Sequence, residues 1–262
     1  MTKFLILTNA RSGSNMLVSA LKHHPNAVCY SELINREILW GYSELDAWGI
    51  RPDMASLLVD PSLIWLRNNV PGDFLDVVYN HRYKADTHAV GFKLFFSQGE
   101  NIDNPAELWS ALAADRSIKI LWLRRRDFIS QYYSFKKAEQ TGEWIYNSNN
   151  FVDTKQKLVM RIHIPSFMHH MGAMQALEQE YLRFFTRHER LDLVYEDITE
   201  NFDREVTKIL DFLQLPQIKL YPATFRQNVH AIRDLVENYD EVEKVANIFA
   251  EPDMSAPTSA ML

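Results

Sequence analysis

A short polar turn near the amino terminus has the residue types of an anion-binding site. The turn reads R-S-G-S at 11–14, and it lies between an apolar run at 4–7 and apolar residues at helical spacing. Gly13 allows the backbone to turn sharply, and Ser12 or Ser14 can cap the helix that follows. A helix N-terminus offers free N–H groups and a positive dipole, to which Arg11 adds a guanidinium. The turn therefore predicts a site for a phosphate or a sulfate group.

The same turn departs from the loop that holds the phosphates of ATP and GTP. That loop needs the pattern G-x-x-x-x-G-K-S/T, and the first glycine and the lysine are absent here. Ordinary ATP or GTP binding is therefore disfavoured. A plain strand-to-helix turn with Arg11 on the surface is the alternative.

A second basic cluster follows an apolar run at 118–123. Arg124, Arg125 and Arg126 come directly before a predicted helix, and Ser134 lies about two turns into that helix. Arg126 and Ser134 can hold a phosphate between a bidentate guanidinium and a hydroxyl. Three arginines at the positive end of a helix dipole are unfavourable, and a bound anion would relieve that conflict. A solvated basic cluster is the alternative.

Two ionisable residues are associated with other predicted strands. Glu32 follows an apolar stretch at 27–30, and functional groups gather at the carboxyl ends of strands in doubly wound sheets. We therefore expect Glu32 near the anion turn. Lys93 is unusual inside the strand predicted at 89–96, because buried lysines are rare and a lysine in a central strand often lies at its solvent end.

Both phosphate motifs resemble those of sulfotransferases that use 3′-phosphoadenosine 5′-phosphosulfate (PAPS). The R-S-G-S turn resembles their 5′-phosphosulfate loop in its bacterial and carbohydrate-enzyme version. The stretch W-L-R-R-R-D-F-I-S-Q-Y-Y-S resembles the 3′-phosphate site of trehalose-type and nodulation-factor-type enzymes. The resemblance implies that residues 11–15, Asn15 included, bind the phosphosulfate. It also implies that Arg126 and Ser134 bind the 3′-phosphate, with Arg125 as the substitute for Arg126. The strand G-F-K-L at 91–94 resembles one that recurs in the bacterial enzymes, which implies that Lys93 faces the active cleft.

Two later segments extend the resemblance. Y-E-D at 195–197 followed by I-L-D-F-L at 209–213 is similar to a family segment whose role is largely structural. Arg226-Gln227 followed by N-Y-D-E at 238–241 resembles a family segment R-K-Q…N-Y-D-E, with Gln227 at the position of its lysine. This similarity makes Arg226 a further candidate for the 3′-phosphate. The resemblance spans residues 4 to about 245, and the two phosphate motifs carry it.

The resemblance implies an in-line transfer of the sulfuryl group from PAPS to a hydroxyl, with PAP as the product. Arg11 and the N–H groups of 12–15 would stabilise charge on the leaving phosphate. No metal is expected, because the transferred group carries less charge than a phosphoryl group.

The acceptor hydroxyl needs a base, and Glu32 matches the glutamate proposed as base in trehalose-type and carbohydrate sulfotransferases. A histidine is the alternative, as in the cytosolic sulfotransferases. The histidines considered for that role are His24, His88 and His163.

The similar families sulfate sugars and glycolipids, so the resemblance implies a carbohydrate or glycolipid-like acceptor. The stretch 35–86 is rich in Trp and Tyr, and we interpret it as a helical insert that caps the acceptor site. Trp40 is a candidate to stack on a sugar ring, with Lys93 and Glu32 as further acceptor contacts. A lipid or polyketide alcohol, a small-molecule kinase on a related fold, and a non-catalytic nucleotide-binding member are the alternatives.

The alternation of strands and helices predicts one α/β domain, 1–262, with a P-loop-type central parallel sheet flanked by helices. Helical inserts at 35–86 and 141–190 and a loose tail at 251–262 complete the expected organisation. Strands are expected at 4–7, 27–30, 89–96, 118–123 and 191–195. Helices are expected at 105–114, 127–138, 176–188, 202–213 and 232–249.

The composition excludes several classes of partner. The net charge of −6 gives no general attraction to nucleic acid or to anionic membranes. The single cysteine, Cys29, permits no internal disulfide and fits a reducing, cytoplasmic location. The first apolar run is too short for a signal peptide or a membrane span. His169 and His170 are adjacent and lack the spacing of a metal-binding helix. A homodimer is possible by analogy with related bacterial enzymes.

Overall fold

The computed structural model describes residues 1–36, 38–39, 60–80, 83–144, 157–222 and 230–249. Within them, five parallel strands form one sheet in the order β2-β3-β1-β4-β5. The strands are β1 (Thr2–Thr8), β2 (Ala27–Tyr30), β3 (Ala89–Phe95), β4 (Ile118–Arg124) and β5 (Arg190–Val194). The predicted α/β class with a central parallel sheet is confirmed.

The sheet forms because its strands are apolar on both faces. Phe4, Leu5, Ile6 and Leu7 in β1 are fully buried, and they belong alternately to two hydrophobic clusters. Successive side chains of a strand point to opposite faces, so each cluster lies on one side of the sheet. An unbroken apolar run is what a strand needs when helices cover both faces.

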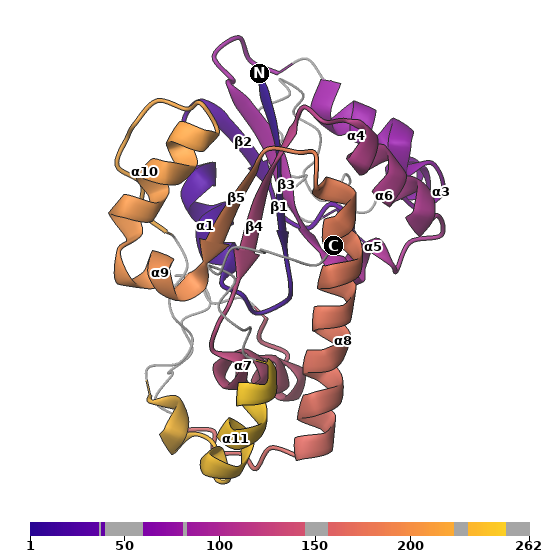
Figure 1. The fold of residues 1–262 in the computed structure, drawn as a ribbon. Helices are drawn as coiled ribbons and strands as arrows, with labels where there is room; N and C mark the ends of the chain where they lie inside the picture. The colour runs from indigo at the N-terminus through magenta and orange to yellow at the C-terminus, as the bar shows by residue number, and fades with distance from the viewer. Residues whose placement is uncertain (37, 40–59, 81–82, 145–156, 223–229, 250–262) are drawn as a thin grey trace, which may run out of the picture.

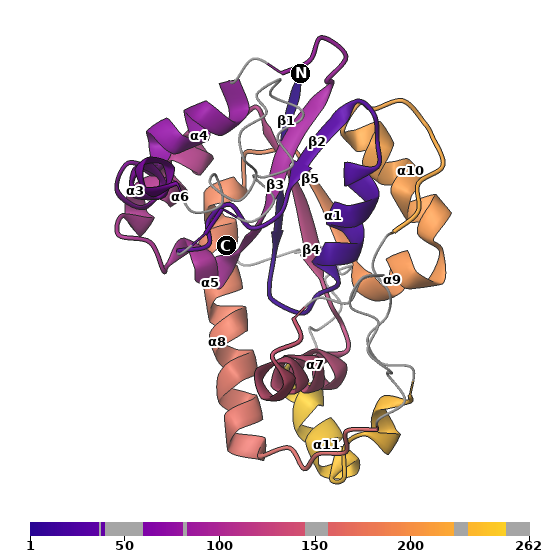
Figure 2. The ribbon, with the colours of Figure 1, turned by 180° about the vertical axis from the view of Figure 1, so that it is seen from behind.

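Helices cover each face, as Figures 1 and 2 show from opposite sides. One face is covered by α3 (Pro61–Asn69), α4 (Pro71–Asn80) and α6 (Pro105–Ala114). The other is covered by α1 (Ser14–Lys22), α9 (Tyr195–Glu200) and α10 (Phe202–Phe212). The short α5 (Phe96–Gly99) follows β3, and the long α8 (Ile164–Leu182) runs beside the sheet into the short 3₁₀ helix η3 (Arg183–Phe185).

Two further helices lie beyond the carboxyl ends of the strands. These are α7 (Phe128–Thr141) and α11 (Tyr239–Phe249), which pack together with the first half of α8 (Figure 1). The loops that leave β1, β2 and β4 therefore open toward α7 and α8. Among the described residues, the predicted site residues lie at this end of the sheet.

The closing helix is shorter than the predicted 232–249. A single 3₁₀ turn, η4 (Ile232–Asp234), comes first, and α11 begins at Tyr239. Between them Asn238 accepts a hydrogen bond from the amide of Ile162 at 2.9 Å and donates one to its carbonyl at 3.0 Å. These bonds to a distant segment interrupt the helix.

The described part of the first insert packs on the sheet. Tyr79 in α4 donates from its hydroxyl to the carbonyl of Phe4 at 2.9 Å, beside the amino half of β1. Helix α4 therefore covers the amino half of the sheet, while Arg67 of α3 donates to the carbonyl of Leu33, which follows β2. Within the cap expected at 35–86, residues 40–59, which include Trp40, lie outside the described residues. In the part of the chain that the structure describes, no helix combines the length and apolarity needed to cross a membrane.

Candidate active site

The loop between β1 and α1 has a backbone that only certain residues tolerate. Arg11 has φ 63° and Gly13 has φ 81°, both in the left-handed region. A Cβ added to Gly13 would lie 2.1 Å from Cδ2 of Tyr195. Tyr195 follows β5 and begins α9, so its ring covers the loop from the end of a strand that lies two positions from β1 in the sheet. Glycine is required at 13 both for its φ and for this close approach.

The first turn of α1 is not capped in the way the sequence predicted. Gly13 occupies the cap position, and no side chain of the described residues caps it. Ser12 instead donates from Oγ to the carbonyl of Asn9 at 2.7 Å and accepts from Gln131 at 3.2 Å. Ser14 is buried at the start of the helix. The N–H groups of this turn are therefore available to an anion.

Three contacts fix the loop to its surroundings. Thr8 donates from its hydroxyl to the carbonyl of Leu123 at 2.6 Å. The side-chain amide of Asn9 donates to Glu178 of α8 at 2.6 Å. The side-chain amide of Gln131 in α7 donates to the carbonyl of Ala10 at 2.7 Å. These contacts hold the loop in place before any ligand binds.

Arg11 connects the loop to α7. Its Nε donates to Oγ of Ser134 at 2.9 Å, and its Nη1 donates to the carbonyl of Trp144 at 2.6 Å. Burial, together with the nearby charge of Arg125, lowers the pKa of Arg11 to about 10. The guanidinium of Arg125 also donates to the carbonyl of Arg11 at 3.1 Å. Two partly desolvated cations beside one loop favour an anionic ligand.

Arg126 and Ser134, predicted to hold one phosphate, each contact another residue in this structure. The side chain of Arg126 is 65 % exposed and contacts both oxygens of Asp197, at 3.1 and 3.2 Å. Ser134 contacts Arg11 instead. The two predicted phosphate motifs are thus brought together, but through a different pair of residues.

Carboxylates offset the arginines at the start of α7. Asp127 accepts from the amide of Ser130 at 2.8 Å, which caps the helix. Glu196 accepts from the amides of Arg126 and Asp127 at 3.0 and 3.1 Å. The electrostatic conflict inferred from the three arginines is therefore relieved within the protein. It does not by itself require a bound anion.

Glu32 lies just after β2, where two donors hold its carboxylate. Oε1 accepts from Nζ of Lys93 at 2.8 Å, and Oε2 accepts from the side-chain amide of Gln98 at 2.6 Å. Lys93 also donates to Oδ1 of Asn15 at 2.6 Å. The structure thus brings Glu32, Lys93 and Asn15 together, and it places the carboxylate beside the anion loop.

Lys93, which was expected to face the cleft, is enclosed. Its side chain has no solvent-exposed area. Burial lowers the pKa of Lys93, while the Glu32 carboxylate acts in the opposite direction. Figure 1 shows β3 between β2 and β1, which is why a side chain from β3 can reach both neighbouring strand ends.

The three histidines considered as alternative bases lie away from this group. His24 is buried near the far end of α1, where its ring contacts the carbonyl of Pro216 and the amide of Asn26. His88 precedes β3 at the amino end of the strand. His163 precedes α8 and contacts the hydroxyl of Ser166 at 2.9 Å. None of them contacts the anion loop.

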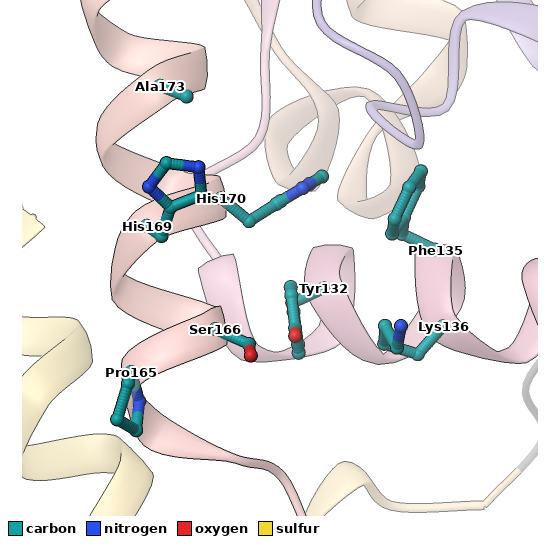
Figure 3. A pocket seen from close by; sticks show the side chains of 8 residues that line it. All are labelled: Tyr132, Phe135, Lys136, Pro165, Ser166, His169, His170 and Ala173. Carbon is teal, nitrogen blue, oxygen red and sulfur yellow. The ribbon is translucent and has the colours of Figure 1, made fainter.

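An open pocket of about 490 Å³ lies in the angle between α7 and α8 (Figure 3). In Figure 3 the rings of Phe135 and His170 point toward one another, and their centroids are 4.4 Å apart. Phe135 directly follows Ser134, and its ring also packs against Trp144, whose carbonyl accepts from Arg11. The pocket is therefore adjacent to the Arg11 side of the loop. Sequence reasoning considered His170 only as a metal ligand, and no local pattern signals this packing.

Arg226 lies outside the described residues, as does Trp40. Among the residues that are described, no group of three or more His, Cys, Asp or Glu side chains is arranged to hold a metal ion. Cys29 is buried in β2.

The sequence matches the family model described as Stf0 sulphotransferase over residues 3–241. No curated protein matches it significantly. The fold is similar to that of a sulfotransferase from Alicyclobacillus acidocaldarius, with a TM-score of 0.50 and 13 % identity over 95 % of this chain and 92 % of that one. It is also similar to the sulfotransferase domain from the curacin biosynthetic pathway, with a TM-score of 0.53 and 12 % identity over 90 % of this chain and 82 % of that domain. At such identities these likenesses concern the fold.

Proposed function

Because this chain belongs to the Stf0 sulphotransferase family, we propose that it transfers the sulfuryl group of PAPS to a hydroxyl of a carbohydrate or glycolipid-like acceptor. The enzyme is a PAPS-dependent sulfotransferase, and PAP is its product. One observation carries the finer proposal: a carboxylate, Glu32, lies at the end of β2 beside the anion loop and is tied to Asn15 of that loop through Lys93.

The loop is proposed to hold the 5′-phosphosulfate. Its uncapped N–H groups at 12–15 and the guanidinium of Arg11 supply hydrogen bonds and positive charge. Arg125, which contacts the carbonyl of Arg11, adds to the same field. These groups are proposed to stabilise the negative charge on the leaving phosphate, so the proposal needs no metal ion.

The 3′-phosphate is proposed to bind at Arg126 and Ser134, with help from Arg226. In the structure Asp197 holds Arg126 and Arg11 holds Ser134. A phosphate at this position would replace Asp197 as the partner of an exposed guanidinium, which costs little because exposed ion pairs contribute about 1 kcal/mol or less. If Arg126 keeps its contact with Asp197, Arg125 is proposed to bind the 3′-phosphate in its place.

The chemical step is proposed as an in-line displacement at sulfur. The acceptor oxygen forms a bond to sulfur, the bond from sulfur to the 5′-phosphate oxygen breaks, and the hydroxyl proton passes to Glu32. The side chain of Glu32 is 18 % exposed, so part of the carboxylate is open to the cleft. Each oxygen keeps a lone pair after accepting from Lys93 or Gln98.

The pocket between α7 and α8 supports a sugar-like acceptor. Tyr132, Phe135 and His170 present aromatic rings there, beside the polar groups of Lys136 and Ser166. Rings that pack on C–H faces and donors that bind hydroxyls are what a sugar requires. A lipid or polyketide alcohol would use the rings alone. A cytoplasmic location is also part of the proposal, because the single cysteine fits a reducing compartment. A homodimer is included by analogy with related bacterial enzymes.

Two measurements test this function. Isothermal calorimetry should give micromolar or tighter binding of PAP and weak binding of ATP. Radiolabelled PAPS offered with a panel of trehalose, glucose, N-acetylglucosamine and a long-chain alcohol should label a sugar. Binding of ATP without binding of PAP would favour a kinase, and labelling of the long-chain alcohol alone would replace the carbohydrate assignment.

A further inference from the structure

Lys93 is a charged side chain in the interior of a parallel sheet. It lies in β3, where Ile6 of β1 is its neighbour in register, and the residue has no exposed area. An ammonium group without compensating partners is strongly unfavourable in such a place. Its burial there requires specific partners that offset the loss of hydration.

The partners of Lys93 come from two motifs that are distant in sequence. Nζ donates to Glu32 at 2.8 Å and to Asn15 at 2.6 Å, and it lies 4.6 Å from the centroid of the Phe95 ring. Asn15 belongs to the first turn of α1, at the anion loop. Glu32 follows β2. One ammonium group therefore fixes the distance between the loop and the carboxylate.

We propose that Lys93 is a positioning residue for the transfer reaction, which acts by holding Glu32 at a fixed place and orientation relative to the phosphosulfate loop. This inference rests on the proposed role of Glu32 as the base. It replaces the expectation that Lys93 contacts the acceptor directly, because an enclosed ammonium already bound to two oxygens does not reach a ligand in the cleft.

Gln98 completes the restraint on the carboxylate. It donates to Oε2 while Lys93 donates to Oε1, so both oxygens are held and the plane of the carboxylate is fixed. A base must keep its lone pair aimed at the hydroxyl proton, and a misplacement of about 1 Å can cost about 10²-fold in rate. With Lys93 removed, Gln98 alone leaves the carboxylate free to rotate.

The chain supplies a matched control in Lys119. This lysine lies in the adjacent strand β4, contacts Glu189 at 3.1 Å and lies 5.0 Å from the centroid of the Phe212 ring. It thus has a carboxylate partner and an aromatic neighbour like Lys93, but neither Glu189 nor Phe212 belongs to the anion loop. Lys119→Met reports what the loss of a strand lysine does to folding alone.

The test is a double-mutant cycle of Lys93→Met and Glu32→Gln in the full chain, with Lys119→Met as the control. Two rates are measured for each variant: transfer from PAPS to the best acceptor of the sugar panel, and release of sulfate from PAPS to water. PAP binding is measured by calorimetry, and folding by the midpoint of thermal unfolding.

Lys93→Met is expected to lower kcat for transfer to the sugar acceptor by about 10²-fold. The KM for PAPS and the Kd for PAP should stay within about fivefold of the wild-type values. In the Glu32→Gln background Lys93→Met should add less than about threefold, because its effect acts through Glu32. Lys119→Met should keep the wild-type kcat.

The inference is overturned if Lys93→Met keeps the wild-type kcat. It is also overturned if the fold-decreases in kcat caused by Lys93→Met and by Glu32→Gln multiply in the double variant. It is also overturned if the loss appears equally in PAP binding, which would make Lys93 a support of the donor site only. If Glu32 is not the base, Glu32→Gln alone will keep the wild-type rate of transfer. That result is distinct from the outcomes that overturn the role of Lys93.

Discussion

Arg11 and Ser134, 123 positions apart in the chain, share a hydrogen bond of 2.9 Å from Nε to Oγ. This bond joins the β1–α1 loop to α7 and places the two predicted phosphate motifs side by side. With the phosphate sites proposed above, PAPS would therefore place both of its phosphate-bearing ends close to Arg11. Ser134 cannot bind a phosphate without sharing it with Arg11 or displacing Arg11.

Gly13→Ala should abolish most of the binding of PAPS and of its product PAP. An alanine Cβ would meet the ring of Tyr195 at 2.1 Å and would also have to adopt φ 81°. Displacement of the loop should remove at least one or two charge-assisted bonds, so we expect PAP affinity to fall by about 10²-fold, measured by calorimetry.

Gly142→Ala is the matched control for this change. Gly142 also has a positive φ, 72°, but an added Cβ would meet nothing within 4 Å. We expect a loss of about 1 kcal/mol in stability and no change in PAP affinity. Equal effects of both substitutions on PAP binding would show that the contact with Tyr195 does not shape the site.

Arg126→Ala should weaken PAP binding by about 10- to 10²-fold and leave AMP binding unchanged, because only PAP carries a 3′-phosphate. Asp197→Asn should tighten PAP by up to about fivefold, since it removes the carboxylate that competes for Arg126. Calorimetric titrations with both nucleotides check the two results. A loss of PAP binding in Arg125→Ala but not in Arg126→Ala would transfer the role to Arg125.

His170 should make the fold less stable in mild acid. Burial lowers the pKa of His170, with Glu139 raising it and Lys136 and His169 lowering it. The unfolded chain then binds a proton more readily than the folded one, so stability present above the unfolded value of about 6.5 is lost as pH falls below it.

His170→Phe keeps a ring against Phe135 and removes this titration. Its midpoint of thermal unfolding should therefore fall less than that of the wild type between about pH 7.5 and about pH 5. His169→Phe is the control on the same helix. An identical pH dependence in the wild type and in His170→Phe would exclude this role for His170.

The strands and the anion loop could be predicted because local sequence determines them. Unbroken apolar runs gave β1 to β5 to within two residues or so at each end. Gly13 marked the sharp turn, and the structure shows that the space under Tyr195 imposes the same requirement. Glu32 could be placed near the loop because strand ends of a parallel sheet share one edge.

Partners that come from distant parts of the chain could not be predicted. The spacing of Arg126 and Ser134 predicted a shared phosphate, but nothing in it indicated that Arg126 contacts Asp197, some 70 positions later. Gln98 carries no local signal for its contact with Glu32. The burial of Lys93 depends on two neighbouring strand ends that only the folded sheet brings together.

The most direct test of the account is the rate of a single turnover of PAPS with the labelled sugar acceptor in wild type and in Glu32→Gln. Glutamine is nearly the same size as glutamate but cannot take the hydroxyl proton, so we expect the rate to fall by about 10²- to 10⁴-fold with PAP binding unchanged. Glu107→Gln, in α6, should keep the wild-type rate. A Glu32→Gln enzyme that transfers sulfate at the wild-type rate would contradict the assignment of Glu32 as the base.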